Sequence, residues 1–117
     1  MLTNKTIILG VTGGIAVYKA ADLASRLTQE GARVEVVLTE AATKFMSPLT
    51  FRILTGTRVI TDMFTAPLEY GETHVSIAEA ADIIVIVPAT ANTIAKITNG
   101  MADNMLTGIV LAAKAPV

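Results

Sequence analysis

The sequence predicts an α/β fold in which helices cover both faces of a parallel sheet. Short runs of β-branched and aliphatic residues alternate with segments of helical periodicity along the 117 residues. The longer of these runs are almost wholly apolar, as expected for strands that are covered on both faces. Glycines separate the first run from the first helical segment. Together these features predict a Rossmann-like (flavodoxin-like) three-layer sandwich.

The first third of the chain gives the clearest elements. Thr6–Val11 is predicted to be a central strand, and a helix is expected over Ile15–Gln29 because its apolar residues recur at helical spacing. Gly31 is expected to end this helix as a C-cap. Arg33–Leu38 is predicted to be the second strand.

The middle of the chain is marked by capping residues. A helical stretch is expected over Glu40–Met46, and Ser47 then serves as the N-cap of a short helix with Pro48 in its first turn. Gly56 is expected to close this short helix. A brief third strand is predicted over Thr57–Ile60.

The last part of the chain continues the alternation. We expect a long loop over Met63–Thr73, followed by a helical or mixed segment over His74–Ala81. A buried strand is then predicted over Ile83–Val87, and two helices over Asn92–Thr98 and Asp103–Ala113. The loop is long enough to have a function of its own. Ala115–Val117 resembles the entry to a further strand, so the sheet is expected to be incomplete at its C-terminal side.

Composition limits the function. The length fits one domain over residues 1–117, with 52% apolar residues, which predicts a subunit interface or a missing covering segment. A net charge of −1 without a basic stripe argues against nucleic acid or an anionic membrane as a partner. Without cysteine and with a single histidine, the chain is predicted to bind no metal. The start of the chain lacks a signal-peptide pattern, and a cytoplasmic location is expected.

The predicted strand order places two loops together. In an open α/β sheet, ligands bind beyond the carboxyl ends of the strands where the order reverses, so Thr12–Gly14 and Pro88–Asn92 are expected to meet there. The glycines leave backbone N–H groups free at a helix start, which suits a phosphate, although they also fit a plain tight turn. Because Thr39 rather than an acid ends the second strand, a mononucleotide is favoured over a dinucleotide.

Four motifs in register identify a family resemblance. They are Gly10–Lys19 (GVTGGIAVYK), His74–Asp82 (HVSIAEAAD), Pro88–Lys96 (PATANTIAK) and Asn99–Leu106 (NGMADNML). The chain resembles, over nearly its whole length, the homo-oligomeric flavin-containing cysteine decarboxylases, and among them the phosphopantothenoylcysteine decarboxylase domain.

This resemblance implies FMN as the cofactor, a small-molecule substrate and a homo-oligomer, either a trimer or a dodecamer. The cofactor would lie near a subunit contact. The residues that the resemblance assigns to FMN, from phosphate region to isoalloxazine ring, are Gly13, Gly14, Ile15, Thr39, Ala89, Thr90, Ala91, Asn92, Met101, Ala102 and Asp103.

The resemblance also implies the chemistry. His74 would be the catalytic residue, since a neutral imidazole takes up a proton near neutral pH. The cysteine part of 4'-phospho-N-pantothenoylcysteine would be oxidised to a thioaldehyde and lose CO2. Reduction of the resulting enethiolate gives 4'-phosphopantetheine for coenzyme A biosynthesis, so no net electrons leave.

Two family elements are expected beyond Val117, namely the segment that grips the substrate carboxylate and a cysteine-bearing flap. The chain alone is therefore expected to be an FMN-binding domain cut before its substrate-binding segment, unable to complete turnover. Alternatives remain open: a peptidyl-cysteine decarboxylase, a non-catalytic flavin-fold binding module or a generic nucleotide-binding domain. Flavin prenyltransferases rank lower, because serine and alanine usually stand where Gly13–Ile15 stands.

Overall fold

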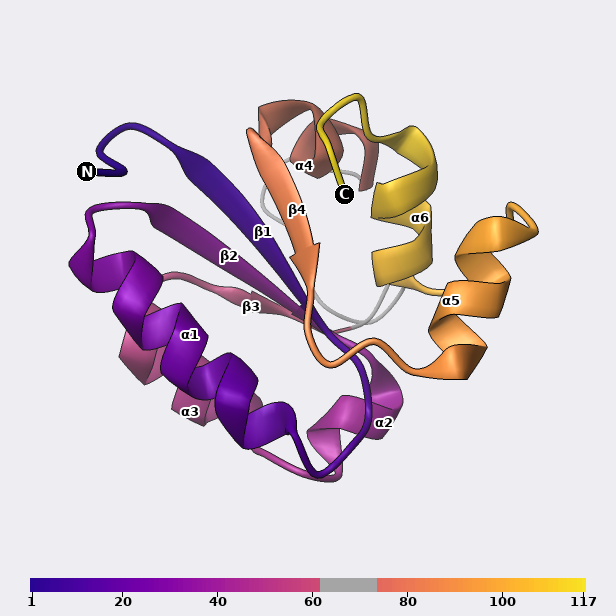
Figure 1. Cartoon of the computed structure of the whole chain (residues 1–117), viewed down its shortest axis with the longest axis horizontal. Helices are drawn as coiled ribbons and strands as arrows, with labels where there is room; N and C mark the ends of the chain where they lie inside the picture. Colours follow the sequence, from indigo (N-terminus) through magenta and orange to yellow (C-terminus); the bar gives the residue numbers. More distant parts are fainter. Residues whose placement is uncertain (62–73) are drawn as a thin grey trace.

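A four-stranded parallel sheet forms the centre of the molecule (Figure 1). The structure is a computed structural model that describes residues 1–61 and 74–117. Across the sheet, the strands are β3 (Val59–Ile60), β2 (Arg33–Leu38), β1 (Thr6–Val11) and β4 (Ile83–Ile86). The order 3-2-1-4 reverses between β1 and β4, as predicted. All carboxyl ends therefore lie at the same edge of the sheet.

Helices cover both faces of this sheet, which confirms the three-layer sandwich. The helices are α1 (Val17–Gln29), α2 (Glu40–Thr43), α3 (Pro48–Thr55), α4 (His74–Ala80), α5 (Ala91–Thr98) and α6 (Met105–Ala112). One buried cluster joins alternate residues of β1 and β2, such as Leu9, to α1 and α3. The opposite cluster joins the intervening residues, such as Ile8, to α4 and α6. Each strand therefore contributes to two cores.

A glycine in β1 lets α6 approach the sheet closely. A Cβ atom built on Gly10 would lie 2.5 Å from Cδ1 of Leu106, so alanine there would require Leu106 to move. Leu106 is the second residue of α6, and Gly10 lies near the carboxyl end of β1. This contact therefore fixes the start of α6 beside the carboxyl end of β1. The same edge carries the predicted site.

The first helix begins later than the sequence predicts, at Val17 instead of Ile15. The amide of Val17 donates to the Gly14 carbonyl over 3.1 Å, and that of Lys19 donates to the Ala16 carbonyl over 2.9 Å. These three-residue steps form a turn that precedes the regular helix. Ile15 consequently stays 85% exposed at the tip of the loop.

The second helix is shorter than predicted and ends at Thr43 instead of Met46. The amide of Lys44 donates to the Ala41 carbonyl over 3.1 Å, so the chain tightens at this point. Pro48 disfavours helical geometry at Ser47, which explains why the two helices do not merge. Ser47 caps α3 and Gly56 ends it with a φ of 70°, as predicted.

Other boundaries move by one or two residues, and the strand β3 is reduced to Val59–Ile60. Gly31 lies one residue beyond the C-cap of α1, which is Glu30, and has a φ of 94°. The predicted loop Met63–Thr73 lies outside the described residues. The segment around Pro116 lies beside the outer edge of β4, where the Ile84 amide donates to the Pro116 carbonyl over 2.9 Å.

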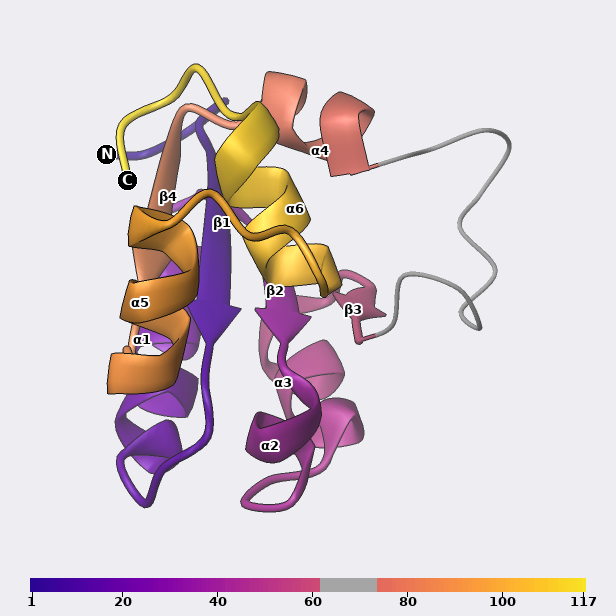
Figure 2. The same ribbon diagram turned by 90° about the vertical axis from the view of Figure 1, so that its right-hand side faces the viewer.

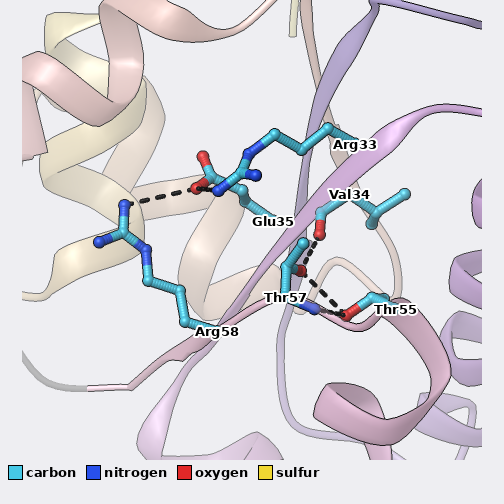
Figure 3. Close-up of polar contacts among 6 residues, drawn as sticks. All are labelled: Arg33, Val34, Glu35, Thr55, Thr57 and Arg58. Atoms are coloured by element: carbon cyan, nitrogen blue, oxygen red, sulfur yellow. Dashed lines mark hydrogen bonds and ion pairs between the residues drawn. The ribbon is translucent and has the colours of Figure 1, made fainter.

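A polar network joins β2 to the segment that leads into β3 (Figure 3). Glu35 is 4% exposed, and its Oε1 lies 3.4 Å from a guanidinium nitrogen of Arg33 and 3.4 Å from one of Arg58. Nearby, the Thr57 hydroxyl donates to the Val34 carbonyl, and the Thr57 amide donates to Oγ1 of Thr55 over 3.2 Å. The network compensates a carboxylate buried under α4 and fixes the end of α3 against β2.

Candidate functional site

A cavity of about 420 Å³ opens at the carboxyl ends of the strands. Its wall comes from the loop after β1, the start of α2, the start and one face of α5, and the residues before α6 (Figure 2). A volume of this size is typical of small-molecule sites. The loops predicted to meet at the topological switch point therefore do form one wall.

Thr12 joins the two loops of the site and is 1% exposed. Its hydroxyl donates to the Pro88 carbonyl and accepts a hydrogen bond from the Thr90 amide over 2.9 Å. Its own amide donates to the Pro88 carbonyl over 3.2 Å. A single buried side chain thus fixes the segment around Thr90 against the end of β1.

The two glycines after Thr12 have different surroundings. A Cβ on Gly13 would lie 2.6 Å from the Cβ of Ala41, so the start of α2 packs directly on this glycine. A Cβ on Gly14 would meet only Cγ of Pro88, at 3.8 Å. Gly13 is therefore required by packing, whereas no contact among residues 1–61 and 74–117 requires glycine at Gly14.

Three helices begin at the cavity, and each has a side-chain cap. The hydroxyls of Thr39 and Thr90 accept from the amides of Ala42 (3.2 Å) and Thr93 (3.1 Å), at the starts of α2 and α5. Asn104 caps α6 as part of a capping box with Thr107, whose amide donates to Oδ1 of Asn104 over 2.8 Å. Helix starts carry partial positive charge, which favours anions near them.

Formal charges in the wall are few. Glu40 and Asp103 contribute carboxylates, and Lys96 contributes an ammonium group whose Nζ lies 3.0 Å from Oδ2 of Asp103. Over residues 1–61 and 74–117, no three His, Asp or Glu side chains come close enough to hold a metal ion. Among the described residues, the wall therefore offers hydroxyl, amide and backbone groups together with two carboxylates and one cation.

The structure brings together part of the predicted cofactor set. Gly13, Thr39, Thr90, Asn92 and Asp103 line the cavity. The other members flank it without lining it, and most of them are exposed; they are Gly14, Ile15, Ala89, Ala91, Met101 and Ala102. Binding roles for all of these residues remain predictions.

His74 does not line this cavity. It is the first residue of α4, and residues of that helix, including Ala80, lie with Thr6 and Arg33 around a separate hollow where the strands begin. The helix α4 lies beside α6 on one face of the sheet, toward the amino ends of the strands and away from the cavity (Figure 2). Within a single chain, the predicted catalytic residue is therefore not among the residues that line the cavity with the predicted cofactor residues.

Six residues that line the cavity lie outside the predicted cofactor set; they are Thr12, Glu40, Ala41, Thr93, Lys96 and Asn104. Helical spacing could have identified two of them, because Thr93 and Lys96 follow Asn92 on the same face of α5. Thr12 directly follows the first strand and belongs to the loop predicted to lie at the switch point, so its position was a signal as well. Asn104 looks like an ordinary cap in the sequence, and nothing there marks it as part of a cavity.

Comparison with known proteins places the chain among close relatives. A bifunctional coenzyme A biosynthesis protein, CoaBC, of Bacillus subtilis (strain 168) is 51% identical over 117 residues. This match covers the whole chain but only 29% of the relative, so the chain spans less than a third of that protein.

No helix in the described ranges is long and apolar enough to cross a membrane.

Solved structures agree with this placement. An FMN-dependent cysteine decarboxylase, SpaF, superposes with a TM-score of 0.88 at 33% identity, covering 99% of this chain and 67% of that one. A mutant of PPC decarboxylase, C175S, complexed with pantothenoylaminoethenethiol, gives a TM-score of 0.74 at 28% identity, covering 94% and 61% of the two chains. The Flavoprotein family model matches residues 1–117. The chain therefore belongs to the Flavoprotein family.

Proposed function

We propose that this chain binds FMN and forms part of an enzyme that decarboxylates 4'-phospho-N-pantothenoylcysteine to 4'-phosphopantetheine in coenzyme A biosynthesis. The observation that carries the proposal is the cavity at the switch point, whose wall comes from three of the four family motifs and the end of β2. The similarity to CoaBC of Bacillus subtilis and to PPC decarboxylase supports the substrate.

The residues present fit FMN. The volume of about 420 Å³ suits a ligand of this size, and the absence of side chains on Gly13 and Gly14 lets a ligand approach the backbone closely. Helix starts at Thr39 and Thr90 favour a phosphate nearby. Hydroxyl and amide groups such as that of Asn92 suit the polar edge of a ring system.

When bound, FMN supplies reversible two-electron oxidation of the cysteine part of the substrate. The protein's share is to orient the reactants and exclude water. Thr12 holds the Thr90 segment in place, so both loops are preorganised before a ligand arrives. His74 takes up or donates the proton of the reaction.

His74 does not line the cavity of its own chain, since α4 lies at a separate hollow where the strands begin. If His74 acts on a substrate in the cavity, it therefore comes from a second copy of the chain. The enzyme would therefore work as a homo-oligomer. We propose a trimer or a dodecamer, located in the cytoplasm. Exposed apolar side chains near the site support a subunit contact: Ile15 is 85% exposed, Ile94 52% and Met101 48%.

The alternative within the same chemistry is a peptidyl-cysteine decarboxylase. The superposition on SpaF at a TM-score of 0.88 favours it, whereas the 51% identity to CoaBC favours the coenzyme A substrate. The two candidates differ in substrate, so one assay distinguishes them.

The test of the function uses the purified protein that carries this chain. We expect visible flavin absorption, and CO2 release from 4'-phospho-N-pantothenoylcysteine but not from a peptide that ends in cysteine. Release from the peptide alone would instead assign the peptidyl-cysteine activity. A protein that binds FMN and acts on neither substrate would be a flavin-fold binding module.

The test of His74 compares two substitutions on α4. We expect His74→Asn to lower kcat by at least about 100-fold while flavin binding is retained, because a proton-transfer group is lost. Glu79→Gln removes a charge from an exposed position of the same helix and serves as the control. Equal activities of the two variants would remove His74 from the mechanism.

A further inference from the structure

The cavity holds an unbalanced set of charges. Two carboxylates, Glu40 and Asp103, line it, and Lys96 is the one cation that lines it among the described residues. A phosphate monoester carries between one and two negative charges near neutral pH. Such a ligand would enter a wall that is already net negative, and helix starts offer only partial positive charges to oppose it.

The geometry presents Lys96 to this cavity. Lys96 lies three and four residues after Thr93 and Asn92, so all three residues share one face of α5, and all three line the wall. The Lys96 side chain is 23% exposed. Its Nζ contacts Oδ2 of Asp103, whose side chain is 49% exposed and thus well solvated. An ion pair with a solvated partner contributes little net stability, so breaking it costs little free energy.

We propose that Lys96 is the counter-charge for a phosphate monoester in the cavity, and that it exchanges the Asp103 carboxylate for that phosphate when the ligand binds. The proposal rests on the proposed function, and it adds a specificity-determining residue to it. The shared chemistry is a phosphate monoester, which either the flavin or the substrate can supply.

The first measurement is the affinity of the flavin-free protein that carries this chain for FMN and for riboflavin, by quenching of flavin fluorescence. We expect Lys96→Gln to weaken FMN binding by about 10- to 100-fold and to leave riboflavin binding unchanged, as for loss of a charged hydrogen bond. Lys96→Arg should keep most of the preference for FMN. Added salt should weaken FMN binding less in Lys96→Gln than in the natural protein.

A second measurement distinguishes the source of the phosphate. If the FMN preference persists in Lys96→Gln while kcat/KM falls for the phosphorylated substrate and not for its dephosphorylated form, the substrate phosphate is the partner. If neither preference changes, the proposal is wrong. Equal losses for FMN and riboflavin would also overturn it, since Lys96 would then be only a structural tie to Asp103.

Lys114→Gln is the matched control, because Lys114 is exposed and does not line the cavity. It should behave like the natural protein in both assays. The outcome also separates this proposal from the function itself. If the natural protein binds FMN and Lys96→Gln keeps both the preference for FMN over riboflavin and the preference for the phosphorylated substrate, only the role of Lys96 fails. If the natural protein binds no flavin, both fail.

Discussion

At the scale of single residues, the two adjacent glycines of the first loop have separable roles. Gly13 makes room for the Cβ of Ala41, which lies 2.6 Å from where a Cβ on Gly13 would stand. Among the described residues, a Cβ on Gly14 would meet only Pro88, at 3.8 Å. One glycine therefore contributes to the packing of α2 on β1. The other leaves room for a ligand.

We expect Gly13→Ala to lower the free energy of unfolding by about 1–3 kcal/mol, because α2 must move away from the loop. Gly14→Ala should leave that free energy nearly unchanged and should weaken FMN binding. Denaturant unfolding and a flavin titration on the two variants measure the two effects. Equal unfolding curves would show that α2 adjusts without cost.

Single residues also mark the limit of what the sequence predicts. In the sequence, Thr12 is a single polar residue between an apolar strand and two glycines. In the structure, its hydroxyl donates to the Pro88 carbonyl and so joins two segments 76 residues apart. Lys96 is the last residue of the family motif Pro88–Lys96, but its contact with Asp103 depends on how α5 lies against the segment before α6. Spacing along one helix is predictable, whereas contacts between distant elements require the tertiary structure.

At the scale of elements, the first two strands and the capped helix α3 were predicted with their bounds, whereas β3 and the starts of some other helices were not. The bounds of β1 and β2 agree with the prediction, because buried strands need continuous apolar runs. The helix α1 starts two residues late, since Ala16 offers no side-chain cap and the first turn forms around Gly14. The polar network between β2 and β3 was not predicted, because Glu35 looks like an ordinary polar residue within a strand.

That network allows a comparison of two arginines that contact the same carboxylate (Figure 3). The Arg33 side chain is 60% exposed and that of Arg58 is 26% exposed. We expect Arg33→Met to cost less than about 1 kcal/mol of unfolding free energy, as for exposed ion pairs. Arg58→Met should cost about 2–3 kcal/mol, because it removes the less solvated partner of buried Glu35. Denaturant unfolding measures both, and equal costs would contradict the ranking.

At the scale of the whole molecule, the proposed separation of His74 from the cavity within one chain makes activity a property of the assembly. A variant with His74→Asn and a second variant with Asn92→Asp would each be inactive alone, the first in proton transfer and the second in flavin binding. Co-expressed, they should form mixed oligomers in which some sites combine an intact cavity with an intact His74.

We expect such mixed preparations to regain a measurable fraction of the natural CO2 release, and to elute at the same size as the natural oligomer. Each variant expressed alone provides the baseline. A mixed preparation as inactive as its components would mean that both residues act within the same chain, contrary to the proposed arrangement.

The strand order 3-2-1-4 has a consequence for biosynthesis. The first strand made, β1, is one of the two inner strands of the sheet, and its neighbour on one side, β4, starts only at Ile83. The cavity needs Thr12 from the beginning of the chain and Asn104 from beyond α5. During translation, α5 and the start of α6 must leave the ribosome before the cavity can form. Flavin loading is therefore expected to be a late event, and until β4 is made one edge of β1 is an unpaired strand edge.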